Sequence, residues 1–280
     1  MAETRRLAER LVFPEGPRWH DGKLWFSDMN AQQVMTVDLS GNLETIVTVP
    51  GNPSGLGWNL QGELLIVSMG DRRLLKLTDK GLEEVANLWN LATYHCNDMV
   101  VDAKGRAYIG NFGFDLNTGE PIRTAEIIMV TPDGEARIVA DDLLFPNGTV
   151  ITPDGKTLIV GETYGSRLTA FDIALDGSLS GRRVWAGMNG PVPDGISLDA
   201  EGGIWVASPT TSEVFRILEG GDITDRIPMH AGTYACMLGG EEGRTLFILT
   251  SEPPDPFAGR PFHGGCIDVI DVDIPHAGLP

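Results

Sequence analysis

The sequence predicts an all-β fold, a six-bladed β-propeller built as a single domain over residues 1–280. A strand–turn–strand pattern recurs six times along the chain. The units are about 40 to 50 residues long, the length typical of a four-stranded propeller blade. The chain also contains 35 glycines and 18 prolines, which suits many short strands joined by tight turns.

One turn glycine in each unit sets the register of the repeat. Successive glycines are 40, 43, 50, 47 and 41 residues apart: Gly22, Gly62, Gly105, Gly155, Gly202 and Gly243. An apolar run such as 63–67 (ELLIV) follows each glycine, and a second run such as 33–37 (QVMTV) comes next, so both are predicted strands. Residues 5–13 are expected to close the ring as an outer strand of the last blade. A β-sandwich does not explain the regular spacing, and β-helix coils are shorter.

Two longer segments interrupt the repeat, at 112–124 (FGFDLNTGEPIRT) and 251–265 (SEPPDPFAGRPFHGG). Each is expected to connect the first two strands of its blade and to overhang the ring axis. They are either ordinary surface loops or a lid that sets specificity.

Composition excludes several classes of function. The net charge of −18 opposes binding to nucleic acid or to an anionic membrane, since both need a positive surface. No stretch approaches the roughly 20 apolar residues of a membrane span. The first ten residues lack the apolar core of a secretory signal, so a cytoplasmic location is expected. Cys96, Cys236 and Cys266 have no metal-ligand spacing and are expected to be free buried thiols. Nothing indicates an oligomeric state.

One position ahead of each turn recurs in every unit, eight residues before the turn glycine or seven in the first unit. We call these six positions the slot: Glu15, Ser54, Asn97, Asn147, Asp194 and Ala235. Equivalent positions of a closed repeat converge on its axis. Two carboxylates and two amide oxygens suit one hard divalent cation, Ca²⁺ first, with Mg²⁺ and Mn²⁺ as alternatives. Zn²⁺ is less favoured because the slot contains no histidine or cysteine.

Each slot residue also has an ordinary interpretation. Asn147-Gly148 and Asp194-Gly195 are common turn pairs, and Glu15 could be a solvated carboxylate. Their recurrence in one register favours the metal. Such a cation could polarise a carbonyl or phosphoryl oxygen, and Asp194 is the candidate base.

Several residues near the slot are candidates for contact with a substrate. His95 lies two residues before Asn97, which on a strand places both on the same face, although a structural histidine is the alternative. Weaker rim candidates are His230, Tyr234 and His263. Three tryptophans on or beside predicted strands are expected in the blade core: Trp19, Trp25 and Trp205.

Five segments resemble the senescence marker protein (regucalcin)/gluconolactonase family: 15–19 (EGPRW), 96–98 (CND), 145–148 (FPNG), 192–195 (VPDG) and 199–207 (DAEGGIWVA). The resemblance extends along nearly the whole chain. It implies a six-bladed propeller with one divalent cation that hydrolyses sugar lactones. It also implies metal ligation by Glu15, Asn147 and Asp194, substrate contact by Asn97, and Asp194 as the base.

The chain departs from this pattern at His95, where aldonolactonase members carry an arginine that contacts sugar hydroxyls. The segment 112–124 also differs from the usual substrate-contacting segment. The sequence therefore predicts a lactonase acting on a small-molecule lactone without specifying which one. Two alternatives stay open, a phosphotriester hydrolase using the same metal site and a non-catalytic calcium-binding propeller.

Overall fold

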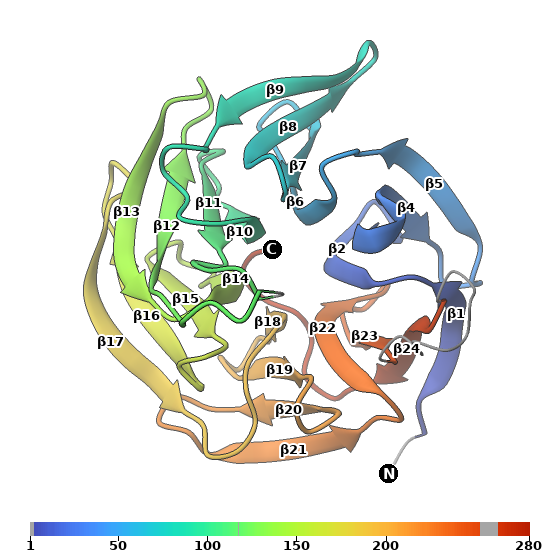
Figure 1. The fold of residues 1–280 in the computed structure, drawn as a ribbon. Coiled ribbons are helices and arrows are strands. Elements are labelled where there is room, and N and C mark those ends of the chain that lie inside the picture. The colour runs from blue at the N-terminus through green and yellow to red at the C-terminus, as the bar shows by residue number, and fades with distance from the viewer. Residues whose placement is uncertain (1–2, 117, 253–262) are drawn as a thin grey trace.

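Six four-stranded antiparallel sheets surround one axis (Figure 1), as the sequence predicts. The structure, a computed structural model, describes residues 3–116, 118–252 and 263–280. The innermost strands of blades 1 to 6 are, in order, β2 (Pro14–His20), β6 (Pro53–Trp58), β10 (Cys96–Val101), β14 (Pro146–Ile151), β18 (Ile196–Leu198) and β22 (Gly232–Gly239).

The second strands of the blades carry most of the buried apolar runs. They are β3 (Lys23–Asp28), β7 (Leu64–Ser68), β11 (Ala107–Asn111), β15 (Thr157–Glu162), β19 (Ile204–Ser208) and β23 (Thr245–Ser251). The third strands are β4 (Gln33–Val37), β8 (Arg73–Thr78), β12 (Ala125–Val130), β16 (Arg167–Ile173), β20 (Glu213–Ile217) and β24 (Gly265–Asp271). A 3₁₀ turn, η1 (Met29–Ala31), joins β3 to β4.

The outer strands include the predicted closure of the ring. Blade 6 takes its outer strand from the start of the chain, because β1 pairs antiparallel with β24. The outer strands are β5 (Leu43–Thr48), β9 (Gly81–Asn87), β13 (Ala136–Leu143), β17 (Leu179–Gly187), β21 (Ile223–Pro228) and β1 (Arg5–Leu11).

The turn glycines behave as the repeat predicts, with φ between 68° and 81° in all six units. This left-handed conformation favours glycine, which has no Cβ. The apolar core lies between blades. Between blades 3 and 4, for example, Val100 and Tyr108 belong to the same buried cluster as Leu158 and Phe171. The three cysteines are free and buried, as expected.

The two long segments connect the first two strands that follow the turn glycine of their blades, as predicted. Segment 112–124 joins β11 to β12, the second and third strands of blade 3, and 251–265 likewise lies between β23 and β24. Both connections lie at the slot end of their blades, because the second strand runs back from the turn glycine. Most of the 251–265 segment, residues 253–262, falls outside the described residues.

The end of the chain crosses the opposite side of the ring. Beyond β24, His276 N donates to Gly243 O at 2.8 Å, and Ala277 N donates to Leu198 O at 3.0 Å. Leu279 and Ile151 then exchange two backbone hydrogen bonds of 2.8 and 2.9 Å. The C-terminus thus lies at the middle of the ring in Figure 1, against blades 6, 5 and 4.

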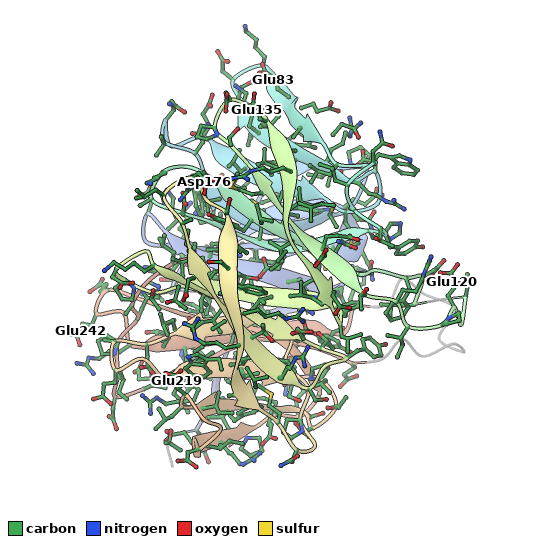
Figure 2. All side chains as sticks on the ribbon, turned by 90° about the vertical axis from the view of Figure 1, so that its left-hand side faces the viewer. Glu83, Glu120, Glu135, Asp176, Glu219 and Glu242 are labelled. Atoms are coloured by element: carbon green, nitrogen blue, oxygen red, sulfur yellow. The ribbon has the colours of Figure 1, made fainter. Side chains whose placement is uncertain are left out.

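Acidic side chains project from separate parts of the surface, as Figure 2 shows for Glu135, Asp176, Glu219 and Glu242. The negative charge is therefore spread over several blades. In the described ranges, no helix is long and apolar enough to cross a membrane.

The buried carboxylate of Glu162, at the end of β15, anchors the chain where it enters blade 4. Its oxygens accept bonds from Arg167 Nε at 2.9 Å and from the backbone N of Leu144 at 2.8 Å. Burial alone would raise the pKa of Glu162, but these bonds and that of Thr169 lower it below the usual 4.5. Glu162 thereby fixes the chain just ahead of Asn147.

We expect Glu162→Gln to destabilise the protein by about 1–3 kcal/mol at pH 7, because the charge-assisted bonds are lost. A lowered pKa contributes stability above about pH 4.5 that disappears as the pH falls. The difference in the free energy of urea unfolding between wild type and variant should therefore shrink below about pH 4.5. The exposed Glu242→Gln is the control, and a difference independent of pH would contradict the assignment.

Candidate functional site

The structure brings the six slot positions together at one end of the inner strands. Glu15, Ser54, Asn97 and Asn147 are each the second residue of an inner strand. Ala235 lies within β22, and Asp194 lies two residues before β18. Hydrogen bonds link neighbouring positions, as Ser54 Oγ lies 3.5 Å from Asn97 Oδ1, and Asn97 Nδ2 lies 3.4 Å from Pro146 O.

A break in strand pairing occurs at the slot in five of the six inner strands. The register shifts between Glu15 and Arg18, and at the same place in the next blades: Pro53/Leu56, Cys96/Met99, Pro146/Thr149 and Thr233/Ala235. Such a bulge twists the strand and changes the direction of a side chain. The repeated bulges therefore turn the slot side chains out of the regular alternation of the sheets.

Glycines beside the slot let the inner strands approach one another closely. A Cβ on Gly148 would lie 2.5 Å from Ile196 N, and one on Gly195 would lie 2.7 Å from Ala235 Cα. Backbone bonds cross the same gaps, from Gly148 N to Asp194 O at 3.1 Å and from Gly195 N to Tyr234 O at 2.8 Å. Any larger residue would separate the blades and widen the ring.

Two carboxyl groups of the slot are held in unfavourable surroundings. Burial raises the pKa of Asp194 despite a hydrogen bond with Asn147, and the charge of Asp98 adds to the increase. Burial and the charge of Asp194 together raise the pKa of Glu15 well above its usual value. In both groups the surrounding protein offsets only part of the cost of the ionised form.

Asp98 and Arg18 also belong to this site, although the repeat pattern assigns them no role. Arg18 Nη2 donates to Asp98 Oδ1 at 2.7 Å, and Arg18 Nε donates to Leu56 O at 3.0 Å. Both side chains are almost fully buried. A signal was present in the sequence, since blade 3 places an aspartate where four other blades place a glycine directly after the slot.

The donor set fits a hard cation. Asp194 Oδ1 is buried and has no hydrogen-bond partner. Asn147 Nδ2 donates to Thr163 Oγ1 at 3.3 Å, which orients the amide and leaves its oxygen out of that contact. Among the described residues, no group of three or more His, Cys, Asp or Glu side chains could hold a metal. Glu15, Asn147 and Asp194 instead combine two carboxylates with one amide oxygen, a set typical of Ca²⁺.

His95 lies just before β10 and not on the strand. Its ring stacks on Tyr94 with centroids 4.2 Å apart and lies 6.2 Å from the ring of Phe112. Burial lowers the pKa of His95, and the charge of Arg72 lowers it further against the opposing charge of Asp115, which favours the neutral imidazole. Its contact with a substrate stays a prediction.

The weaker rim candidates have different positions. Tyr234 packs on Phe13 with ring centroids 4.6 Å apart, and burial and the charges of Asp194 and Glu15 raise its pKa, so it lies near the slot. His230 is exposed and lies 3.2 Å from Arg6 of β1, towards the outer edge of blade 6. His263 is exposed.

Of the tryptophans expected in the core, only Trp205 is fully buried. Trp19 stacks on Phe247 and is half-buried, and Trp25 is also half-buried. The core assignment is therefore confirmed in full for one of the three.

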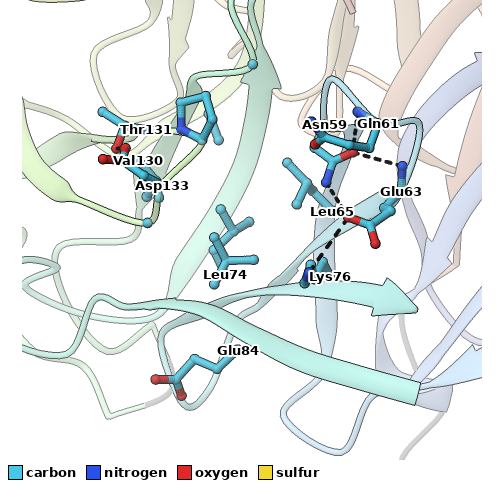
Figure 3. A pocket seen from close by; sticks show the side chains of 15 residues that line it. Asn59, Gln61, Glu63, Leu65, Leu74, Lys76, Glu84, Val130, Thr131 and Asp133 are labelled. Atoms are coloured by element: carbon cyan, nitrogen blue, oxygen red, sulfur yellow. Dashed lines mark hydrogen bonds and ion pairs between the residues drawn. The ribbon is translucent and has the colours of Figure 1, made fainter. Parts of the chain in front are cut away.

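A groove of about 270 Å³ lies between blades 2 and 3 (Figure 3) but contains no slot residue. It is lined by Gln61 and Gly105 and therefore lies at the turn-glycine end of the strands. Its polar side chains pair with one another, since Asn59 Nδ2 donates to Glu63 Oε2 at 2.7 Å. The groove is separate from the ring of slot residues.

Known proteins share this architecture and sequence pattern. Over its whole length the chain is 26% identical to a 6-deoxy-6-sulfogluconolactonase from Pseudomonas putida and covers 99% of it. It is 25% identical to a diisopropyl-fluorophosphatase from Loligo vulgaris, over 66% of this chain and 65% of that protein. A calcium-binding protein, regucalcin, from Agrobacterium tumefaciens has the same fold, with a TM-score of 0.83 over 100% of this chain and 97% of the other at 23% identity.

A family model described as the SMP-30/Gluconolactonase/LRE-like region matches residues 13–252. The match begins ahead of the first slot residue and ends after β23, so it includes the inner strand of every blade. The chain therefore belongs to the SMP-30/gluconolactonase/LRE-like family, as its motifs indicate.

Proposed function

We propose that this protein is a divalent-metal-dependent hydrolase that opens the ring of a small lactone. The observation that carries the proposal is the buried oxygen Asp194 Oδ1, which lies beside a second strained carboxyl group and has no hydrogen-bond partner. The lactonase named among the relatives supports the class of reaction.

Glu15, Asn147 and Asp194 would hold the cation, with Ca²⁺ as the first candidate and Zn²⁺, Mn²⁺ or Mg²⁺ as alternatives. The solved structure described as a calcium-binding protein supports Ca²⁺ as the first candidate. When bound, the cation supplies a Lewis acid for the lactone carbonyl. Ser54 and Ala235 lie in the two blades next to that of Glu15, and their small side chains would leave room beside it.

Asp194 would act as the base. Its Oδ1 accepts a proton from a water molecule while the water oxygen forms a bond to the lactone carbonyl carbon. The ring C–O bond then breaks, the proton passes to the departing alkoxide, and the product is a hydroxy acid. Asn97 would orient the substrate, because Ser54 and Pro146 fix its amide from both sides.

A phosphotriester hydrolase is the second candidate. The relative named diisopropyl-fluorophosphatase favours it, although that likeness covers only 66% of this chain. The same oxygen donors could serve a phosphoryl group, so substrate assays have to separate the two functions.

We expect Ca²⁺ to raise the melting temperature of the EDTA-treated protein, since binding at a hundredfold excess over Kd stabilises by roughly 2.7 kcal/mol. Asp194→Asn should lose most of this increase. In EDTA at pH 9 the variant should melt higher than wild type, because it removes a charge that Glu15 and Asp98 repel. The exposed Asp176→Asn is the control. Equal calcium responses in wild type and Asp194→Asn would contradict the ligand assignment.

Hydrolysis of a panel containing simple lactones, glucono-δ-lactone and paraoxon should depend on the metal. We expect metal removal to abolish turnover, and Asp194→Ala to lower kcat by about 10²–10⁴-fold. Asp176→Ala should leave kcat unchanged. Turnover that survives both EDTA and Asp194→Ala would overturn the mechanism, and paraoxon as the preferred substrate would favour the second candidate.

His95→Arg should improve hydrolysis of glucono-δ-lactone. Arginine offers five donors to sugar hydroxyls, whereas neutral histidine offers one. We expect kcat/KM for this substrate to rise about tenfold, a gain equivalent to one good hydrogen bond of about 1.4 kcal/mol. His95→Gln is the matched neutral variant, and an equal rise in both would show that charge and donor number are irrelevant.

A further inference from the structure

Aromatic rings form a continuous series at the slot end of blades 3 and 4. His95 stacks on Tyr94, and its ring lies 6.2 Å from that of Phe112. Phe112 in turn stacks on Phe145, with centroids 4.6 Å apart and the planes inclined by 23°. Tyr164 continues the series, 5.6 Å from Phe145. We call these five side chains the aromatic arc.

The arc is adjacent to the slot. His95 and Phe145 each lie two residues before a slot asparagine, Asn97 and Asn147, along the same chain segments. Backbone bonds connect the arc across the loop, because Phe112 N donates to His95 O at 2.9 Å. A molecule bound at the slot therefore has the arc on its blade 3 and blade 4 side.

The arc is not simply core. Tyr164 is 46% exposed, and Tyr94, His95 and Phe112 are half-buried, whereas Phe145 is buried beneath them. Phe145 has φ of +61°, and it is the only aromatic residue in the described ranges with a positive φ. This conformation is unfavourable for a bulky side chain, and such strain tends to occur at functional sites.

The hydrogen-bonding groups of the arc are two tyrosine hydroxyls, at Tyr94 and Tyr164, and the ring of His95. The neighbouring cation, Arg72, is engaged, since its guanidinium lies over the rings of Trp89 and Tyr94 and donates to Ala92 O at 3.0 Å. The faces of the rings themselves offer no hydrogen-bonding group to a sugar hydroxyl. A flat apolar group would gain stacking on these faces.

We propose that the lactone taken by this site carries an aryl or similar flat apolar substituent, which stacks on the aromatic arc. This proposal rests on the lactonase function proposed above and names its substrate class. The insert 112–124 then has a role in specificity, because it supplies Phe112 from its first position.

Binding and turnover of paired compounds test the proposal on the calcium-loaded protein. Calorimetry compares three lactams, which resist hydrolysis: δ-valerolactam, its phenyl-substituted form and gluconolactam. Turnover is measured with the corresponding lactones. We expect the phenyl-substituted lactam to bind at least tenfold more tightly than gluconolactam, and the phenyl lactone to have the highest kcat/KM.

We expect two single variants, Phe112→Leu and Tyr164→Ser, to bind the phenyl lactam about tenfold more weakly. Their affinity for δ-valerolactam should change less than twofold. Tyr164 is exposed, so its variant is expected to fold even if Phe112→Leu does not. Trp58→Leu is the matched control, because Trp58 stacks on His20 at the other end of the inner strands.

The outcomes separate the two proposals. Three results would overturn the aromatic substrate class. Gluconolactam could bind as tightly as the phenyl lactam, or the arc variants could lose equal affinity for both δ-valerolactam and its phenyl form. The third result is that no lactam binds. Preferred binding of the phenyl lactam without turnover of any lactone would support the ligand class and overturn the lactonase function.

Discussion

Three carboxyl groups, those of Glu15, Asp98 and Asp194, lie close together near the axis of the propeller, with the buried guanidinium of Arg18 beside them. Arg18 neutralises Asp98 through a direct hydrogen bond, while the pKa values of Glu15 and Asp194 remain raised. When all three carboxyl groups are ionised, the positive charge of Arg18 leaves a net charge of −2. A divalent cation matches that charge, so the arrangement that is costly in the metal-free protein is the one that would bind the metal tightly.

The backbone makes this concentration of charge attainable. Close contacts at Gly148 and Gly195 bring neighbouring inner strands together, and the repeated bulges take the slot side chains out of the regular alternation of the sheets. Glu162 anchors the chain before Asn147 from the rim side. Stability and function are thus coupled, because the hydrogen bonds that close the ring also set the spacing of the candidate ligands.

Much of the fold follows from periodic features of the sequence. The turn glycines, the slot and closure by residues 5–11 depend on spacing and residue type, which a repeat preserves. The Arg18–Asp98 pair could not be predicted, since residues 80 positions apart meet only after the ring closes. The same holds for the contacts of His95 and Phe112. The place of the inserts between the two strands that follow the turn glycine also depends on this repeat.

The terminal segment through His276 and Leu279 lies across the far end of the ring and lines a pocket there together with Arg18. A substrate and its product would then enter and leave the slot from the same end. A hydroxy acid leaving the slot and a fresh lactone approaching it would exclude each other. Inhibition by product should accordingly be competitive, because both molecules would occupy the slot, and the rate of release would depend on contacts with the aromatic arc.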